Sequence, residues 1–230
     1  KGVIQVGDTI TTVTGDATLT TGNGTITVGE ADGTGRINAG GNVTINAAKE
    51  SATNTNLVDI LTSVESRNAN VNVKTVNGNI HIGSNGANTE TVTAKQNVKL
   101  EAENGKIIID GKTSTLVGDI TMQATNASYV SGDTGKNIII NHSGVVESAR
   151  NVNLITVNGD LHVTDNVTAQ GTLNAETRKS EDQKILNPEA KSGDISLDQN
   201  VTVVKDMTMQ AEKGDITVGR NITAENGNVT

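Results

Sequence analysis

The dominant pattern in this chain is a short alternation of apolar and polar residues that returns at a regular interval. In each copy an apolar residue stands seven positions before a glycine, and another apolar residue stands two positions after it. Four copies begin at Val71, Val98, Val152 and Met207, so their starts are 27, 54 and 55 residues apart, which is one, two and two lengths of about 27. A repeat of this size predicts a solenoid, in which one supersecondary unit stacks on the next.

The alternation predicts strands. Segments 24–28, 42–47, 119–124 and 194–197 place Val, Ile, Leu, Met or Ala at every second position, with Thr, Asn, Ser or Gln between them. A period of two directs one set of side chains inward and the other into water, and the β-branched, polar Thr suits the outer set.

The last repeat indicates how one coil is built. Residues 207–209, 216–218 and 222–224 form three strand-like steps, and Val229 begins the next coil. Gly, Asn and Asp stand at the corners, where they adopt positive φ at low cost. We therefore predict a parallel β-helix with three short strands and about 22–28 residues per coil. Nine coils of that kind would form a rod roughly 40–45 Å long.

A tandem antiparallel sandwich is the rival architecture. Asn-Gly, the strongest short hairpin signal, occurs at 23–24, 77–78, 85–86, 104–105, 158–159 and 226–227. We favour stacking because the unit is too short to form a sandwich alone. Copies also carry a third strand-like step, at 166–169 and 221–224, that starts seven residues after the glycine.

Two stretches interrupt an otherwise single β-helix segment over residues 1–230. Residues 50–67 carry apolar side chains at 57, 58, 60, 61 and 64, which predicts a short amphipathic helix or an irregular corner. Residues 176–192 are dense in charge and hold Pro188, the one proline, so we expect a surface loop that leaves the rod between Leu173 and Ile195. Because the pattern runs to both ends, we expect a fragment of a longer chain.

The composition agrees with a narrow interior. The 230 residues include no Cys, Phe or Trp, one Tyr and 25 Gly, so Val, Ile, Leu, Ala and Thr must fill the core. Disorder is the alternative for such a polar chain, and the regular spacing argues against it. Without cysteine there is no disulfide or thiolate site. The net charge of −8 disfavours nucleic acid and anionic membranes, and no apolar run approaches the ~20 residues of a membrane span.

Candidate chemistry is sparse. Asp119, Asp160, Asp194 and Asp215 each follow a corner glycine, and in a stack they would form a column able to bind a cation. A turn preference explains them as well, because Asn occupies similar places at 42 and 79, and we favour that interpretation. We therefore predict no catalytic, cofactor-binding or metal-binding residues and no cofactor.

The three histidines form no triad or metal set in the sequence. His81 and His162 stand at the same outward repeat position, three repeats apart, which is roughly 14 Å along the stack. His142 lies in an irregular region. Asn-x-Ser/Thr sequons begin at positions 23, 42, 126, 141, 166, 200, 221 and 228, and many arise by chance in a chain rich in Asn and Thr.

Three segments carry a family resemblance. Residues 41–47, 118–124 and 211–218 resemble the repeats of filamentous haemagglutinin-like proteins, the large exoproteins of two-partner secretion in Gram-negative bacteria. The resemblance covers most of the chain and rests on a degenerate pattern of Gly, Asn or Asp and alternating aliphatic residues. It implies a right-handed parallel β-helix shaft, exported unfolded through a partner outer-membrane transporter to the medium or the cell surface. It also implies adhesion to a host or bacterial receptor, or presentation of a distal effector.

The expected function is therefore that of a structural and adhesive shaft rather than an enzyme. A self-assembling extracellular filament or surface-layer subunit, in which coil ends stack on other copies, is one alternative. A carbohydrate-active β-helix enzyme, a lyase or hydrolase, is another, and it would require a groove with three or more convergent carboxylates and bases.

Overall fold

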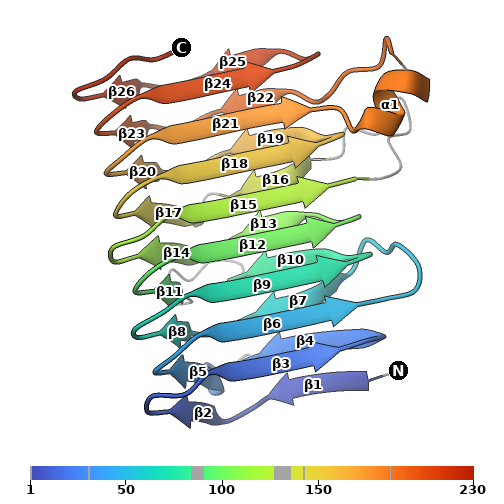
Figure 1. Ribbon diagram of the computed structural model, residues 1–230, viewed down its shortest axis with the longest axis vertical. Coiled ribbons are helices and arrows are strands. Elements are labelled where there is room, and N and C mark those ends of the chain that lie inside the picture. The colour runs from blue at the N-terminus through green and yellow to red at the C-terminus, as the bar shows by residue number, and fades with distance from the viewer. Residues whose placement is uncertain (1, 31, 84–90, 127–135, 142, 187) are drawn as a thin grey trace.

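The chain winds into a stack of nine coils whose strands form three parallel sheets (Figure 1). The computed structural model describes residues 2–30, 32–83, 91–126, 136–141, 143–186 and 188–230. Each of the first eight coils contributes one strand to each sheet in turn, in the order A, B and C, and the ninth contributes β25 to sheet A and β26 to sheet B.

In stacking order, sheet A contains β1 (Gly2–Val6), β4 (Gly24–Val28), β7 (Asn56–Ile60), β10 (Asn79–Ile82), β13 (Ile107–Ile109), β16 (Lys136–Ile140), β19 (Asp160–Val163), β22 (Ile195–Leu197) and β25 (Ile216–Val218). Sheet B contains β2 (Thr9–Thr12), β5 (Arg36–Ala39), β8 (Val64–Ser66), β11 (Thr91–Ala94), β14 (Lys112–Thr115), β17 (Val145–Ser148), β20 (Val167–Ala169), β23 (Val201–Val203) and β26 (Ile222–Ala224). Sheet C contains β3 (Ala17–Thr21), β6 (Val43–Ala48), β9 (Val71–Val76), β12 (Val98–Glu103), β15 (Ile120–Thr125), β18 (Val152–Val157), β21 (Leu173–Arg178) and β24 (Met207–Ala211).

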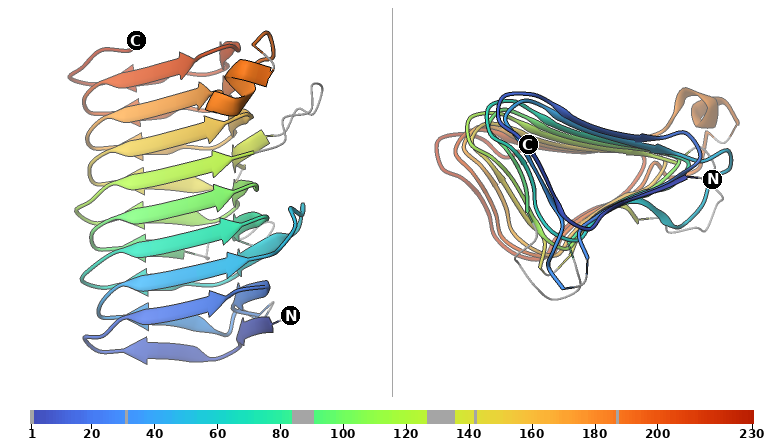
Figure 2. Two further views of the ribbon diagram at one scale, coloured as in Figure 1. Left: turned by 45° about the vertical axis from the view of Figure 1, so that its right-hand side comes forward. Right: turned by 90° about the horizontal axis from the view of Figure 1, so that it is seen from below.

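The handedness of the coil can be followed in the figures. Sheet C faces the viewer in Figure 1, and its strands run from left to right as the chain climbs from the N-terminus to the C-terminus. Figure 2 shows the triangular cross-section that the three sheets enclose. The molecule is a right-handed parallel β-helix with three strands per coil, as predicted. Val229 pairs with Met207, so the last coil closes where the sequence indicated.

Coil lengths vary more than the repeat suggests. The equivalent first residues of the sheet C strands are Ala17, Val43, Val71, Val98, Ile120, Val152, Leu173 and Met207. Successive members of that series are 26, 28, 27, 22, 32, 21 and 34 residues apart. The interval of about 27 is thus an average over coils of unequal length. The shortest coils need 21 or 22 residues, and longer coils add residues at corners.

Where the structure describes them, the Asn-Gly dipeptides turn corners of the coil and do not form hairpins; the one at 85–86 lies outside the described residues. Asn77, Asn104 and Asn158 have φ of 65°, 54° and 57° and lead from sheet C into the next strand of sheet A. Asn tolerates this left-handed conformation better than most residues. The glycine that follows is needed for space, because a Cβ on Gly105 would lie 2.1 Å from the carbonyl oxygen of Gly78 in the coil below. The antiparallel sandwich is therefore wrong.

The core is a set of stacked aliphatic layers. Inward positions of sheet A place Ile80, Ile107, Ile138, Leu161 and Ile195 directly above one another, and all five are fully buried. Burying one such side chain contributes about 1.5–3 kcal/mol. No aromatic ring is needed, because each layer spans only the narrow space between three sheets.

Hydroxyl groups replace aliphatic side chains where the inward positions reach a corner. The buried Thr75 and Thr156 donate to the carbonyl oxygens of Gly78 and Gly159, each at 2.6 Å. The bond satisfies a carbonyl group that the sheets leave unpaired at the bend.

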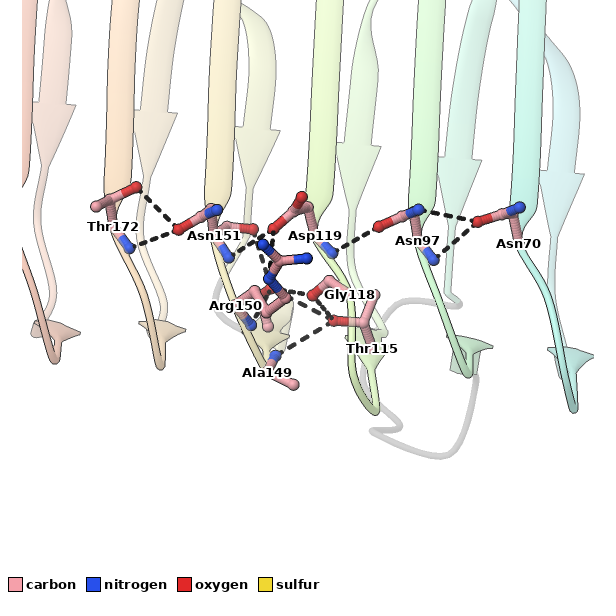
Figure 3. A network of polar contacts seen from close by, with 10 residues as sticks. Asn70, Asn97, Thr115, Gly118, Asp119, Ala149, Arg150, Asn151 and Thr172 are labelled. Carbon is pink, nitrogen blue, oxygen red and sulfur yellow. Dashed lines mark hydrogen bonds and ion pairs between the residues drawn. The ribbon is translucent and has the colours of Figure 1, made fainter.

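A ladder of side chains ties the coils together at the corner before sheet C (Figure 3). The residue before each of seven successive strands is, in order, Asp16, Asn42, Asn70, Asn97, Asp119, Asn151 and Thr172. The Oδ1 atom of each Asp or Asn accepts from the backbone N–H of the next member, at 2.6–3.3 Å. Where Asn follows Asn the side-chain amide donates too, at 3.1 and 3.0 Å. Each side chain thereby fixes the register of the next coil.

The expectation for residues 50–67 is wrong in part. Residues 56–60 and 64–66 are the regular strands β7 and β8, and no helix forms there. Leu57 and Val58 are adjacent and both buried, which interrupts the alternation that marks a strand. Leu57 fills the space below the corner glycine Gly78, where a Cβ on Gly78 would lie 2.4 Å from the Leu57 Cγ. The extra apolar residue therefore packs on a corner.

The charged stretch at residues 176–192 leaves the stack later than expected. β21 continues through Arg178, and the excursion that follows carries α1 (Glu181–Leu186), the one helix in the described part of the chain. α1 lies outside the triangular outline, at the corner between sheets C and A (Figure 2). Within the described ranges, no helix has the length and apolar character that a membrane crossing requires.

Removing two whole coils should leave a shorter folded stack. Deleting residues 98–151 joins Asn97 to Val152. Asn97 then takes the ladder position that Asn151 has in the native chain, directly before β18. Deleting one residue more, 98–152, puts the polar Asn153 at the first inward position and reverses the faces of the strand. We expect cooperative melting by circular dichroism for the first variant, and a Tm lower by more than about 10 °C for the second. Equal Tm values would contradict the register argument.

The ladder makes a separate prediction. Asn97→Ala removes the 3.0 Å bond to Asn70 and the 2.8 Å bond from the Asp119 N–H, so it should lower the free energy of unfolding by about 1–2 kcal/mol. The neighbouring Gln96→Ala, which loses one exposed bond to the Asn68 carbonyl, should change it by less than about 0.5 kcal/mol. Denaturant titration measures both values, and equal losses would count against the ladder.

Candidate functional site

A set of ionisable side chains that bond from coil to coil lies on the outer face of sheet A. Strand register places Asp59, His81, Ile108, Ile139 and His162 at equivalent outward positions in five successive coils. His81 and His162 are therefore three coils apart at one repeat position, as predicted. His142 lies outside the described residues.

His81 is held between two carboxylates. Its Nδ1 atom lies 2.6 Å from Oδ1 of Asp59 in the coil below, and its Nε2 atom lies 2.9 Å from Oδ2 of Asp110 in the coil above. Asn141, one coil higher, donates from Nδ2 to Oδ1 of Asp110 at 2.6 Å. We call Asp59, His81, Asp110 and Asn141 the His81 chain, and it links four consecutive coils.

The secondary structure explains the placement of each member. Asp59 and His81 are outward residues of β7 and β10, paired directly in register. Asp110 follows the last residue of β13, and Asn141 follows the last residue of β16. Parallel stacking repeats each position one coil higher, so residues far apart in sequence meet without any special loop.

The environment of His81 favours its charged form. Burial opposes the imidazolium and lowers the pKa of His81, but hydrogen bonds and charge from Asp59 and then Asp110 outweigh burial, so the net shift of the pKa is upward. The side chains of His81 and Asp110 are 15% and 10% exposed. With both ring nitrogens bonded, the ring has no free nitrogen for proton transfer or metal binding. The arrangement suits a clamp between coils.

His162 is held more loosely. Its Nε2 atom lies 2.9 Å from Oδ2 of Asp198, whose Oδ1 accepts from the hydroxyl of Ser196 at 2.8 Å. The Asp198 side chain is 45% exposed, so water screens this pair more than the His81 chain.

The four candidate aspartates do not form one column. Asp160, Asp194 and Asp215 stack at the corner before sheet A, where Asp160 accepts from the Asp194 N–H at 2.9 Å and Asp194 accepts from the Asp215 N–H at 2.8 Å. Lys191 bridges the upper two, with Nζ at 3.3 Å from Asp194 and 2.9 Å from Asp215. Asp119 precedes sheet C and belongs to the ladder of Figure 3. Both corners use Gly-Asp, because both need an acceptor for the next backbone N–H, so the sequence motif does not distinguish them.

No cation site emerges from these groups. Among the described residues, no three or more His, Cys, Asp or Glu side chains are disposed to hold a metal ion. We call Asp160, Asp194 and Asp215 the Asp160 column. In each of them one carboxylate oxygen accepts a hydrogen bond from the backbone of the next coil or from Lys191. These bonds are the ones expected of turn residues.

The sequons differ in their surroundings. The side chains of Asn42 and Asn141 are tied into the ladder and the His81 chain. Asn166, Asn200 and Asn221 are exposed and stand immediately before β20, β23 and β26, so they line one edge of sheet B in three successive coils.

Comparison with known proteins finds no matching family model, no matching curated protein and no matching solved structure. The resemblance to filamentous haemagglutinin-like repeats therefore stays a prediction.

The carboxylate partners of His81 were missed at the sequence level. Asp59 stands one repeat before His81, but it lies in the stretch expected to be irregular, so the pairing was hidden. Asp110 could have been found from the apolar run Ile107–Ile109, since an acidic residue ends that strand.

The His81 chain should stabilise the fold in a pH-dependent way. Because the pKa of His81 is raised above its ordinary 6.5, its contribution is complete below about pH 6.5 and is lost as the pH rises through the folded-state pKa. The difference in unfolding free energy between the native chain and His81→Gln should be about 1–3 kcal/mol at pH 6 and smaller at pH 8.5. His162→Gln is the control and should lose less at pH 6. A difference that grows with pH would contradict the assignment.

Proposed function

We propose that this chain is a structural and adhesive shaft of a large secreted or cell-surface bacterial exoprotein of the two-partner secretion type. The supporting observation is the unbroken inter-coil pairing: nine strands of sheet A and nine of sheet B each continue from one end of the stack to the other. A rod of that construction, roughly 40–45 Å long, holds whatever lies at one end at a fixed distance from the other.

The outer surface supports the same role. Three sets of charged and polar side chains run along the axis: the ladder at the corner before sheet C, the His81 chain on sheet A, and the column of Asp160, Asp194 and Asp215. Each group bonds to the coil above or below, so these side chains stiffen the stack against bending and slippage between coils. These inter-coil bonds support a structural role for the side chains rather than a catalytic one.

The proposed route of export is consistent with the composition. The chain has no cysteine, so no disulfide can form before translocation and block passage of an unfolded chain. The proposed partners are an outer-membrane transporter during export and a receptor on host or bacterial cells afterwards.

Export and adhesion can be tested together. The chain is placed behind a two-partner secretion signal domain and expressed in a non-adherent Gram-negative host with and without the matching transporter. We expect surface display only with the transporter, and at least about tenfold more cells bound to a host-cell monolayer than for the host alone. The unstable deletion of residues 98–152, displayed to the same level, is the control for folding. Display without any gain in binding to host or bacterial cells would contradict the adhesive role.

A self-assembling filament is the second candidate. Ile4, Ile10 and Leu19 of the first coil are partly exposed although they point inward, and Ile216 and Val218 of β25 are 42% and 41% exposed. Stacking on another copy would bury these side chains and pair the open strand edges. Analytical ultracentrifugation of the purified chain tests this: concentration-dependent rods of increasing length support the filament, and a monomer at all concentrations contradicts it.

A further inference from the structure

A groove of about 550 Å³ lies on the outer face of sheet C, beside α1. Its lining includes Val157, Glu176, Arg178, Lys184, Gln210 and Glu212. Three strands in three successive coils supply the floor, β18, β21 and β24, and α1 supplies one wall. We propose that this groove binds an uncharged saccharide of two or three rings, a ligand for the adhesive role proposed above, on which the inference in part rests.

The wall of the groove is fixed in place. The carbonyl oxygen of Pro188 accepts from Nζ of Lys179 at 2.7 Å and from Nζ of Lys213 at 2.8 Å. Lys213 also pairs with Glu189 at 2.9 Å. Lys179 is only 4% exposed, so this anchor is part of the packed structure. A groove that is formed before binding loses less entropy when its ligand arrives.

The charges of the lining balance. Arg178, Lys179 and Lys184 stand against Glu176, Glu181 and Glu212. Nζ of Lys184 lies 2.9 Å from Glu181 and 3.4 Å from Glu212, and Nη1 of Arg178 lies 3.6 Å from Glu176. An anion or a cation would have to break such pairs without a net charge to attract it. A neutral ligand leaves them intact.

The chemistry of the side chains suits hydroxyl groups. Guanidinium, carboxylate and amide groups are planar and offer two atoms side by side, which matches two adjacent hydroxyls of a sugar ring. Arg178, Glu176 and Gln210 supply one group of each kind within the groove. Val157, which is 7% exposed, is the apolar side chain of the floor that ring C–H groups would contact.

Size and affinity follow from the same features. A volume of about 550 Å³ falls within the range of small-molecule sites and holds roughly two or three sugar rings. The described residues of the lining include no aromatic ring for stacking, so a single site should bind weakly. Many copies on one cell surface would raise the effective affinity without new contacts.

The repeat provides a matched control for the test. Gln123, Ile155, Glu176 and Gln210 occupy one outward position in four successive sheet C strands. Gln210 lines the groove, and Gln123 does not appear in its lining. Gln210→Ala and Gln123→Ala therefore remove the same group from the same position of the fold, one inside and one outside the proposed site.

The experiment is a nuclear magnetic resonance titration of the purified chain with a panel of neutral di- and trisaccharides built from hexoses and N-acetylhexosamines, and with their sulfated forms. We expect saturable shifts with at least one neutral sugar, a loss of affinity of at least fivefold in Gln210→Ala and a change below twofold in Gln123→Ala. Binding of sulfated forms only, equal losses in the two variants, or no saturable binding would each overturn the proposal.

Displayed cells separate this proposal from the adhesive role. If cells that carry Gln210→Ala adhere as well as cells that carry the native chain, the groove proposal fails and the adhesive shaft stands. If the native chain gives no adhesion while the groove still binds sugar in solution, the adhesive role fails and the groove stands.

Discussion

The whole structure depends on the hydrogen bonds between one coil and the next. In the strands of internal coils, the backbone groups that point along the axis pair with the coils above and below, so register is the quantity that must be preserved. The ladder from Asp16 to Thr172 enforces it from the side, because each Asp or Asn oxygen accepts from a backbone N–H one coil higher. Aliphatic layers supply most of the free energy, and the side-chain bonds decide which residues stack.

This division explains how a chain whose described core holds no aromatic residue folds to a single structure. A layer of Ile and Leu, such as the one through Ile80 and Ile107, would pack almost as well after a shift of two residues. The corners would not tolerate such a shift. Asn104 must adopt positive φ, and position 105 must be glycine, because a Cβ there would lie 2.1 Å from a carbonyl oxygen. Corner residues therefore contribute specificity where the core contributes stability.

The fold was predictable because its period is written in the sequence. The alternation around Met207, Ile216 and Ile222 fixed the three strands of a coil, and the structure has them there. The predictions that failed concern β7 and the Gly-Asp corners, where one local pattern serves two structural positions. Leu57 and Val58 are both buried because one packs in a layer and the other on a corner, so β7 looked irregular. Gly118-Asp119 and Gly159-Asp160 look alike although they lie at different corners. Asp110 could be found from the end of the apolar run Ile107–Ile109, but Asp59 could not be paired with His81 without knowing the register of the two coils.

The unequal coil lengths show that the chain can vary in two ways, by the number of residues at a corner and by the number of coils. Residues added at a corner, as between Arg178 and Ile195, change the outer surface without moving any layer of the interior. Whole coils, by contrast, change only the reach of the rod. A lineage of such chains can therefore diversify its surface at three edges while its span evolves in steps of one strand spacing, and neither change constrains the other.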